Sequence, residues 1–303
     1  MFVVKHRKIF YIFTGLTLLA SIGALVFWGL NLGIDFTGGA ILEIKYAGER
    51  PDASQLQQKV LEAGFAGAFL QPAGENGLLV RLPDITEEEH QKLLETLAGN
   101  PAKSGIEELR FDSIGPTIGK ELQRKSLIAL FLVLAMILVF ISWGFRRVSE
   151  PVASWKYGLV AIAALMHDII IPAGFFAVLG EFMHAEVGTL FVTALLTLLG
   201  FSVYDTIVVF DRIRENIQRF GKTTAFEEIV GKSLSEVMGR SLATSFVLFL
   251  VLFGLFVFGE SSIRYFVLTL LIGVIAGTYS SVFLASPLIV SLERFSRKSR
   301  QSA

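Results

Sequence analysis

Long apolar runs alternate with shorter polar stretches along the chain. A bilayer core of roughly 30 Å is crossed by about 20 apolar helical residues, and six windows of the sequence approach or exceed that length. The pattern therefore predicts six transmembrane helices, one before and five after a long polar segment. The windows run from Ile9 to Leu30, Leu127 to Phe145, Tyr157 to Leu179, Val187 to Phe210, Leu242 to Phe258 and Tyr265 to Val290.

The first window has an alternative interpretation as a cleaved secretory signal, because Lys5, Arg7 and Lys8 precede it. Its apolar run is longer than the roughly 7 to 15 residues of a signal peptide, and no clear small-residue cleavage site follows. We therefore expect a retained helix. The second window, Leu127 to Phe145, is apolar on every face, which is typical of a helix surrounded by lipid rather than of a surface helix.

Between the first two windows, from Ala40 to Ser113, the pattern becomes alternating and amphipathic, as in a water-soluble domain. ILEIKYA alternates as a strand. SQLQQKVLEAGF places Leu56, Val60 and Leu61 on one helical face, with Ser54 as the expected N-cap. AFLQPAGENGLLVRLP is typical of two short strands around a turn that contains several glycines.

A second helix is expected in ITEEEHQKLLETLAGN. Thr86 and Glu89 have the spacing of a capping box at its start, and Gly99 and Pro101 are typical of its end. IEELRFDSI completes the segment as a last strand. The order β-α-β-β-α-β predicts a ferredoxin-like α+β domain, a fold that hosts unrelated functions and has no activity of its own.

Basic residues lie at alternate ends of the apolar windows. They cluster before the first window, after the second, between the fourth and fifth, and in the tail, whereas Gly180 to Glu186 has none. Cytoplasmic loops carry the excess of Lys and Arg, so we expect both termini in the cytoplasm and the α+β domain outside. The expected organisation is residues 1–32 as N-terminus and first helix, 33–120 as the external domain with its linkers, 121–292 as a five-helix membrane domain and 293–303 as a basic tail.

Composition narrows the function classes further. Charged residues make up 18% of the chain, and Lys plus Arg equals Asp plus Glu at 27 each. A nucleic-acid-binding protein would show a basic excess, so we expect no nucleic-acid partner. The chain has no cysteine, its histidines share no metal-ligand spacing, and neither a P-loop nor a serine nucleophile elbow occurs in it. We therefore expect no cofactor, no metal and no enzymatic activity.

Ionisable residues inside apolar windows are costly in a membrane and are therefore candidate functional residues. His167 and Asp168 lie near the middle of the third window, ahead of Pro172. Adjacent helical residues diverge by about 100°, so we expect that they do not point into one cavity. Two interpretations stay open for them: proton handling, or polar contacts with neighbouring helices and with the backbone groups that Pro172 frees.

Asp205 is the second candidate, in the half of the fourth window that is expected to face the cytoplasm. Ser202 and Thr197 place hydroxyls on its helical face, which is a stripe that can hold water. The alternative is that the span ends near Tyr204, which would leave Asp205 in the headgroup region. The apolar residues that follow Asp205 favour a position inside the span.

Arg240 is the third candidate, at the mouth of the fifth window. An arginine at a cytoplasmic helix end commonly anchors the helix, yet Arg240 shares the cytoplasmic third of its span with Asp205, so an ion pair between them is available. Ser241, Thr244 and Ser245 supply further hydroxyls, or small residues for close helix packing.

Several stretches of the chain resemble the SecF family, the accessory subunits of the bacterial Sec protein-export machinery. They are GIDFTGG from Gly33 to Gly39, IGPTIGKEL from Ile114 to Leu122, the His167-Asp168 pair and, most specifically, GFSVYDTIVVFDRIREN from Gly200 to Asn216. The resemblance covers the whole chain, including the arrangement of one plus five spans around an external domain. Phe201 and Tyr204 stand where the family often has Tyr and Asn.

The resemblance implies half of a resistance-nodulation-division type architecture, with SecD supplying the other half in a heterodimer. It also implies that the pair uses the proton-motive force to help the SecYEG channel and SecA move an unfolded polypeptide across the bacterial inner membrane, with YajC and YidC as further partners. For the site it implies a proton relay of Asp205 and Arg240, with Asp168 as a further candidate. The polar neighbours expected around Asp205 are Ser202, Thr206 and Thr244.

The GIDFTGG stretch forms a candidate motif just outside the first span. Gly33, Gly38 and Gly39 are simplest to interpret as turn residues, because glycine is usual where backbone geometry is unusual. The functional alternative is a hinge that lets the external domain reorient on the membrane helices. The motif residues are Gly33, Asp35, Gly38 and Gly39.

Three functions fit these observations: a subunit of a translocation motor, a proton-driven small-molecule or lipid exporter subunit of the same superfamily, and a non-conducting scaffold. An exporter of this plan normally carries two halves and large external domains in one chain. This chain has one half and one small domain, which favours a heteromeric motor. A scaffold would tolerate the loss of Asp205, whereas a motor would not.

Overall fold

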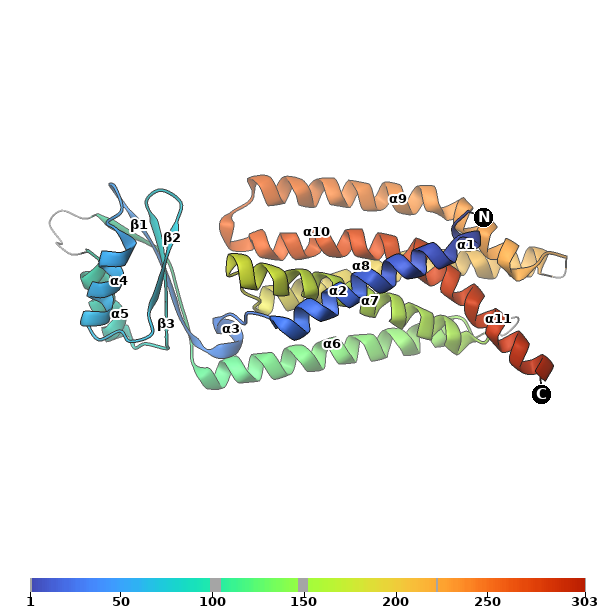
Figure 1. Cartoon of the computed structure of the whole chain (residues 1–303), viewed down its shortest axis with the longest axis horizontal. Helices are drawn as coiled ribbons and strands as arrows, with labels where there is room; N and C mark the ends of the chain where they lie inside the picture. Colours follow the sequence, from blue (N-terminus) through green and yellow to red (C-terminus); the bar gives the residue numbers. More distant parts are fainter. Residues whose placement is uncertain (1, 99–104, 147–151, 222, 303) are drawn as a thin grey trace. The chain divides into compact units, whose positions relative to one another are not determined.

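The computed structural model describes residues 2–98, 105–146, 152–221 and 223–302, and their contacts divide the chain into two units (Figure 1). One unit is Leu32–Leu127. The other combines Met1–Asn31 with Ile128–Ala303. Each unit has its own hydrophobic core, so each is described separately.

The smaller unit is an α+β domain. Its described residues form a four-stranded sheet in the order β2-β3-β1-β4, with every neighbouring pair antiparallel. This order and the β-α-β-β-α-β succession confirm the predicted ferredoxin-like topology. The elements are α3 (Ile34–Thr37), β1 (Gly39–Tyr46), α4 (Ala53–Glu62), β2 (Phe69–Ala73), β3 (Gly77–Leu82), α5 (Glu87–Ala98) and β4 (Ile106–Ile114).

Alternation along β1 decides which face of the sheet is buried. Leu42 and Ile44 are fully buried, whereas Lys45 is exposed. On the neighbouring strand, Val80 pairs with Leu42 and Leu78 pairs with Ile44, so the apolar side chains of both strands point to one face. The apolar stripes of α4 and α5 complete that core with Leu56, Val60, Leu93 and Leu97. Leu61, expected on the same face of α4, is exposed instead, because it follows Val60 and is rotated from it by about 100°.

The start of α5 agrees with the prediction, whereas the start of α4 does not. The capping box is confirmed, because Thr86 N donates to Glu89 Oε2 at 2.8 Å and Glu89 N donates to Thr86 Oγ1 at 3.3 Å. The N-cap of α4 is Asp52 and not Ser54: its carboxylate accepts from the backbone N–H of Ser54 and of Gln55. A carboxylate accepts more strongly than a hydroxyl, and Ser54 instead donates its own hydroxyl to Asp52.

The hydrogen bonds to Asp52, the N-cap residue of α4, also change its pKa. The Ser54 hydroxyl, followed by the backbone N–H groups of Gln55 and Ser54, lowers the pKa of Asp52 below its ordinary value. The expected end of α5 at Gly99 and Pro101 lies outside the described residues.

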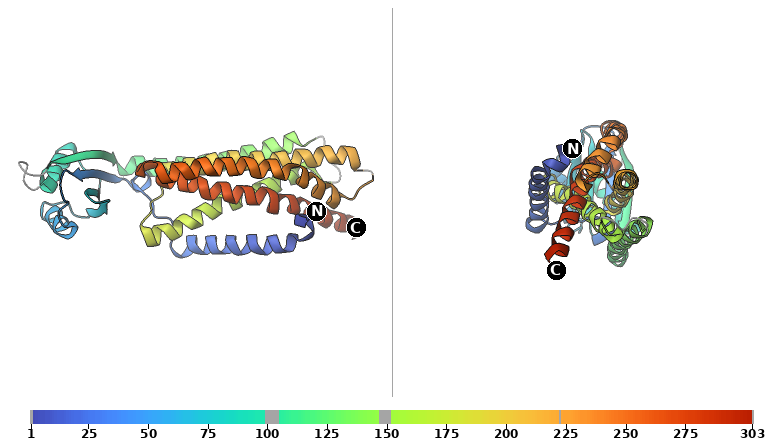
Figure 2. Two further views of the ribbon diagram at one scale, coloured as in Figure 1. Left: turned by 90° about the horizontal axis from the view of Figure 1, so that it is seen from above. Right: turned by 90° about the vertical axis from the view of Figure 1, so that its right-hand side faces the viewer.

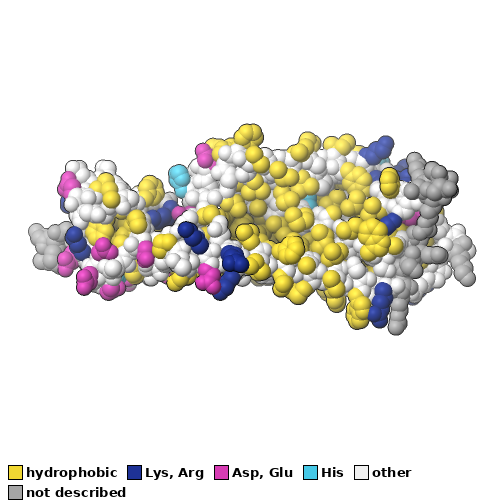
Figure 3. Space-filling view, turned by 90° about the horizontal axis from the view of Figure 1, so that it is seen from below, with side chains coloured by type: hydrophobic (Ala, Val, Ile, Leu, Met, Phe, Trp, Pro, Cys, Tyr) yellow, Lys and Arg dark blue, Asp and Glu magenta, His cyan; other side chains and the backbone are white. Residues whose placement is uncertain are grey.

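The larger unit is a helical bundle whose long helices run beside one another (Figure 2). Within the described residues, six helices are long and apolar enough to cross a membrane, which confirms the predicted one-plus-five arrangement. Hydrophobic side chains cover most of the helical surface in Figure 3. The helices are α1 (Phe2–Lys5), α2 (Arg7–Phe27), α6 (Pro116–Gly144), α7 (Ser154–Met183), α8 (Thr189–Phe220), α9 (Phe226–Phe258), α10 (Arg264–Tyr279) and α11 (Ser286–Ser302), with a short 3₁₀ turn η1 (Ser261–Ile263) and a π-helical turn η2 (Ser280–Ala285).

Helices α8 and α9 continue well beyond the apolar windows. The extension of α8 carries charged residues that pair with one another, and Arg214 lies 2.9 Å from Asp211. Arg212 bonds to Glu215 on its own helix and to Glu236 on α9. The charged ends of the two helices are therefore joined as one antiparallel helical hairpin.

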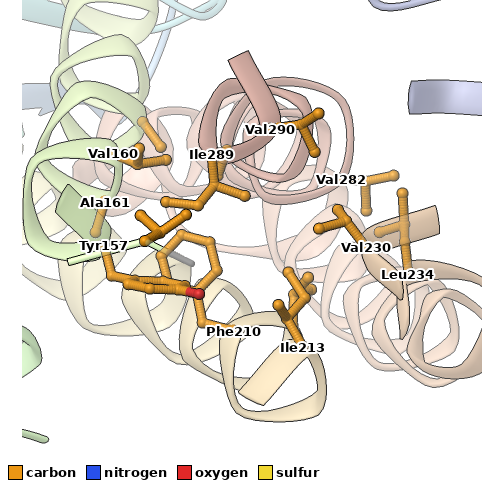
Figure 4. Packing of buried hydrophobic residues seen from close by; sticks show 14 of the residues in the cluster. Tyr157, Val160, Ala161, Phe210, Ile213, Val230, Leu234, Val282, Ile289 and Val290 are labelled. Carbon is orange, nitrogen blue, oxygen red and sulfur yellow. The ribbon is translucent and has the colours of Figure 1, made fainter. Parts of the chain in front are cut away.

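Aromatic packing forms the centre of the core near this hairpin. The rings of Phe145 and Tyr157 stack with centroids 5.3 Å apart, and Phe210 meets Tyr157 edge to face at 5.2 Å. Figure 4 shows Tyr157 and Phe210 between residues of α7, α8, α9 and α11. The segments at this end are also joined by Glu227, which pairs with Arg7 of α2 at 3.0 Å and with Arg294 of α11.

Candidate functional site

Two carboxylates are buried inside the predicted spans. Asp168 on α7 is 1% exposed and Asp205 on α8 is 3% exposed. Removing a carboxylate from water is costly unless hydrogen bonds or an opposite charge compensate it. The partners of each carboxylate therefore indicate what it can do.

Asp168 is the better satisfied of the two. His167 Nδ1 lies 2.9 Å from Asp168 Oδ1, and Ser280 Oγ donates to Asp168 Oδ2 at 2.9 Å. Ser202 of α8 donates to the same Oδ2 atom. Because these donors come from α7, α8 and η2, the carboxylate ties three separate elements together. A Cβ atom at Gly277 would lie 3.6 Å from Oδ2, so the absence of a side chain there keeps the junction open.

His167 and Asp168 were expected not to point into one cavity, yet their side chains contact each other. Their Cα–Cβ bonds do differ in direction by about 100° around the helix. The imidazole ring is long enough to turn back toward the carboxylate, however, and both side chains are almost completely buried. A shared position in the bundle therefore overrides the angular separation of neighbouring residues.

Ser280 is a functional candidate that the sequence analysis missed. It begins η2, the π-helical turn in the last span, where Ser286 Oγ donates to the carbonyl oxygen of Ser281 at 2.9 Å. A single π turn inserts an extra residue into a helix and changes which side chains face the neighbouring helices. The signal that could have found it is GTYSS, from Gly277 to Ser281, a small and polar run inside an otherwise apolar window.

Asp205 is much less satisfied than Asp168. Ser245 of α9 donates to Asp205 Oδ2 at the long distance of 3.5 Å, and Ser241 lies beside the same carboxylate. The buried hydroxyls of Ser241 and Thr206 have no hydrogen-bond partner within the described part of the chain. The helix does not end near Tyr204, since α8 continues for fifteen residues beyond Asp205 to Phe220 and the Asp205 side chain is buried. A position of Asp205 inside the bilayer stays a prediction.

The predicted ion pair between Asp205 and Arg240 is not present in this structure. Arg240 is exposed, and the carboxylate faces the serines of α9 instead. Ser241 and Ser245 are four residues apart and so share one face of α9, whereas Arg240 precedes Ser241 by one residue and is rotated from that face by about 100°. The same rotation turns Thr244 away from the face of α9 that meets Asp205. Thr244 is exposed and donates to the carbonyl oxygen of Arg240.

Two other expected neighbours of Asp205 also bond elsewhere. Ser202 shares the helix of Asp205 but donates to Asp168. Thr197 is exposed and donates to the carbonyl oxygen of Thr193, four residues earlier. Ser202 therefore faces α7, whereas Thr197 lies on the exposed surface of α8.

The GIDFTGG motif belongs to the smaller unit. Gly38 and Gly39 have φ values of +78° and +130°, which side chains rarely adopt. A Cβ atom would lie 2.7 Å from Pro116 Cα at Gly38 and 2.8 Å from the Leu82 carbonyl oxygen at Gly39. Asp35 lies in the first turn of α3, and the φ of Gly33 is −74°, which any residue adopts.

The second glycine motif packs against the first. Gly119, in the IGPTIGKEL stretch, approaches so closely that a Cβ atom there would lie 2.8 Å from the backbone nitrogen of Gly38. Gly39 pairs with Ile114 as β1 meets β4. The two motifs thus form one junction, and its glycines are needed for close backbone contact. Whether that junction also acts as a hinge stays a prediction.

The buried carboxylates are the candidate groups for proton exchange inside the bundle. Within the described residues, no three His, Asp or Glu side chains gather as metal ligands. Asp205 has a weak hydrogen bond and no cationic partner among its described contacts, whereas Asp168 has a titratable histidine beside it. A buried carboxylate of the first kind can hold or release a proton with little rearrangement of its partners.

Comparisons with known families and proteins agree with this architecture. Residues 95–294 match the model of the C-terminal region of the protein export membrane proteins SecD and SecF, and residues 23–48 match the SecD/SecF GG motif. The chain is 41% identical to protein translocase subunit SecF of Thermobaculum terrenum, over 96% of this chain and 93% of that protein. It is 36% identical to SecF of Sebaldella termitidis, over 98% and 93% of the two chains.

Solved structures show the same similarity in three dimensions. SecDF of Thermus thermophilus, a translocon-associated membrane protein, superposes with a TM-score of 0.82 at 30% identity, over 96% of this chain. SecDF in its super-membrane-facing form superposes with a TM-score of 0.67 at 29% identity. The chain spans only 38% and 39% of those two longer chains.

Proposed function

The chain belongs to the SecF family of protein translocase subunits of the Sec pathway, and we propose that it pairs with SecD and uses the proton-motive force to promote protein export. The pairing is supported by the part of SecDF that this chain matches, about two fifths of the longer chain. The unmatched part of that longer chain, about three fifths of it, is large enough to correspond to a second subunit. Proton use is supported by one observation above all: Asp205 is 3% exposed, and its described contacts are serine hydroxyls of α9, with Ser245 Oγ at 3.5 Å, and include no cation.

The proposed cycle uses Asp205 as the group that gains and loses a proton. When it is neutral, the carboxyl group fits between α8 and the serine face of α9 at little cost. When it is ionised, the charge requires either water or a cation. Arg240 is the proposed cation, and pairing would need a conformation in which α9 turns this residue toward α8. A proton-dependent shift between α8 and α9 is therefore the proposed link between proton flow and movement.

The topology and the wider partners belong to the same proposal. Both termini would lie in the cytoplasm and the α+β domain outside the bacterial inner membrane, as the distribution of basic residues favours. The proposed partners beyond SecD are the SecYEG channel, SecA, YajC, YidC and the unfolded exported polypeptide. In this role the chain moves proteins and catalyses no covalent reaction.

The deciding experiment compares Asp205→Asn with Asp211→Asn. Both variants remove one carboxylate from α8, but Asp205 is buried whereas Asp211 is 58% exposed and pairs with Arg214. Inverted membrane vesicles containing each variant with SecD would be tested for export with ATP alone and with an added proton gradient. We expect the gradient to stimulate export in wild type and in Asp211→Asn, and to have little effect in Asp205→Asn.

Co-purification with SecD serves as the control for assembly, because Asn keeps the shape of Asp and should leave the complex intact. Equal stimulation of wild type and Asp205→Asn would exclude Asp205 as the proton-exchanging group. Absence of any stimulation in wild type would contradict the use of the proton-motive force itself.

A further inference from the structure

The junction around Asp168 contains more polar groups than helix packing requires. The carboxylate accepts from Ser202 and Ser280 at Oδ2 and meets His167 Nδ1 at Oδ1. All four residues are between 0% and 3% exposed. We infer that Asp168 and His167 form a second proton-binding site, whose occupancy controls how tightly α8, the helix of Asp205, is held against α7 and the last span. The inference rests on the proposed proton-driven function.

The first step concerns charge. With a neutral imidazole, Nδ1–H donates to the carboxylate and the pair carries a net charge of −1 inside the bundle. One proton taken up at His167 Nε2 converts the pair into imidazolium and carboxylate, with a net charge of zero. Low-polarity surroundings favour the loaded state, and the hydroxyls of Ser202 and Ser280 favour the unloaded anion. The low-polarity surroundings and the serine hydroxyls thus act in opposite directions on proton uptake by the pair.

The second step concerns the groups that could replace the proton. No Lys or Arg forms an ion pair with Asp168 in the part of the chain that the structure describes. From α10, Tyr279 faces the imidazole, with ring centroids 5.9 Å apart. The Tyr279 hydroxyl contacts α2, where it donates to the Phe10 carbonyl oxygen at 3.1 Å and lies 3.0 Å from Thr14 Oγ1. On α8, Tyr204 and Asp205 are the first titratable residues that follow Ser202, and of the two only Asp205 is buried.

The third step links the site to movement. Hydrogen bonds to an uncompensated carboxylate are stronger than those to one already neutralised by a neighbouring cation. Proton uptake by the pair therefore weakens the hold of Oδ2 on Ser202 and on Ser280. Ser202 belongs to α8 and Ser280 begins the π turn, a rare form of helix that occurs frequently at functional sites. Loading the pair would loosen both contacts and let α8 shift with Asp205.

Two adjacent serines of the π turn provide a matched test. Ser280 and Ser281 are both fully buried, but Ser280 bonds to Asp168 whereas Ser281 donates only to the Thr278 carbonyl oxygen, at 3.2 Å. The same vesicles, with SecD present, would be used to measure gradient-stimulated export from pH 5.5 to 9 for wild type, Ser280→Ala and Ser281→Ala. These values of pH bracket the range of about 6 to 8 in which histidines commonly titrate.

Removing a donor to the anion lets the pair keep its proton to higher pH. We expect the pH midpoint of stimulated export to rise by about 0.5 to 1 unit in Ser280→Ala, the size of one lost hydrogen bond, and to stay at the wild-type value in Ser281→Ala. Ser202→Ala should shift it in the same direction. His167→Gln should remove the midpoint, because Gln can donate to the carboxylate but takes up no proton.

Identical pH profiles for wild type, Ser280→Ala and Ser202→Ala would overturn the inference and leave Asp168 as a polar packing contact. Failure of this inference can be told apart from failure of the proposed function. If wild type is stimulated and Asp205→Asn is not, the relay at Asp205 stands whatever the serine variants show. The serine variants remove one hydroxyl each and retain the carboxylate, so the test does not depend on the folding of an Asp168 variant.

Discussion

The backbone of Gly38 lies against that of Pro116 so closely that a side chain at Gly38 would come within 2.7 Å of the Pro116 Cα atom. The contact joins the two glycine-containing motifs of the smaller unit, just before β1 and at the start of α6. It combines two requirements for glycine, a φ of +78° and the lack of space for a Cβ atom.

The first prediction follows from this contact. Gly38→Ala should lower the free energy of unfolding by about 2 kcal/mol, because it strains the backbone and pushes the two motifs apart. Gly48→Ala is the control, since nothing lies within 4 Å of its Cβ position and its φ is not positive. Thermal unfolding of the purified chain in detergent measures both. If Gly38 also acts in a hinge, Gly38→Ala should lower export by more than its loss of stability explains. Unchanged export and unchanged stability would exclude both backbone strain and hinge motion at Gly38.

Close packing of α2 against α7 leads to the second prediction. A Cβ atom at Gly174 would lie 2.4 Å from Ser21 Cβ and 2.5 Å from Ser21 Cα, so the two helices touch through their backbones. Gly174→Ala should destabilise the bundle by about 1 to 3 kcal/mol, the usual range for overpacking. Gly200→Ala on α8 has open space around it and should be neutral. Equal melting temperatures for the two variants would show that α2 moves away freely.

The third prediction concerns alkaline pH. Burial raises the pKa of Tyr46 to about 12, against the smaller opposing effect of Arg50, and its hydroxyl donates to the Leu97 carbonyl oxygen at 3.2 Å. The folded domain holds this proton more tightly than the unfolded chain, whose tyrosines ionise near pH 10. The contribution is therefore fully present below pH 10 and is lost as pH rises from 10 to 12. Tyr46→Phe should show a smaller fall in stability over that interval, measured by denaturant unfolding at each pH.

The fourth prediction tests orientation in the membrane. The chain has no native cysteine, so a single cysteine can be introduced at Glu75, exposed between β2 and β3, or at Thr223, exposed between α8 and α9. An impermeant thiol reagent added to intact inner-membrane spheroplasts should label Glu75→Cys and leave Thr223→Cys unlabelled until the cells are opened. The reverse pattern would invert the proposed topology.

Local pattern alone determined most of the fold. Six apolar windows became six long helices, alternation in ILEIKYA became β1, and the Thr86 and Glu89 spacing became the capping box. Each of these features depends on residues close together in the chain, so periodicity and capping chemistry are enough to predict them. Ser54 shows the limit even there, since the choice between two neighbouring caps depended on the stronger acceptor, Asp52.

The partners of the buried carboxylates were decided only by the tertiary structure. The sequence placed Asp168 and Asp205 inside spans, but not Ser202 on Asp168, Ser280 in a π turn or Arg240 at the surface. The physical reason is rotation: one residue turns a helical side chain by about 100°, and the packing of whole helices sets the rotation of each. Burial in a membrane can thus be predicted from composition, whereas the atom that each buried group meets depends on helices far apart in the chain.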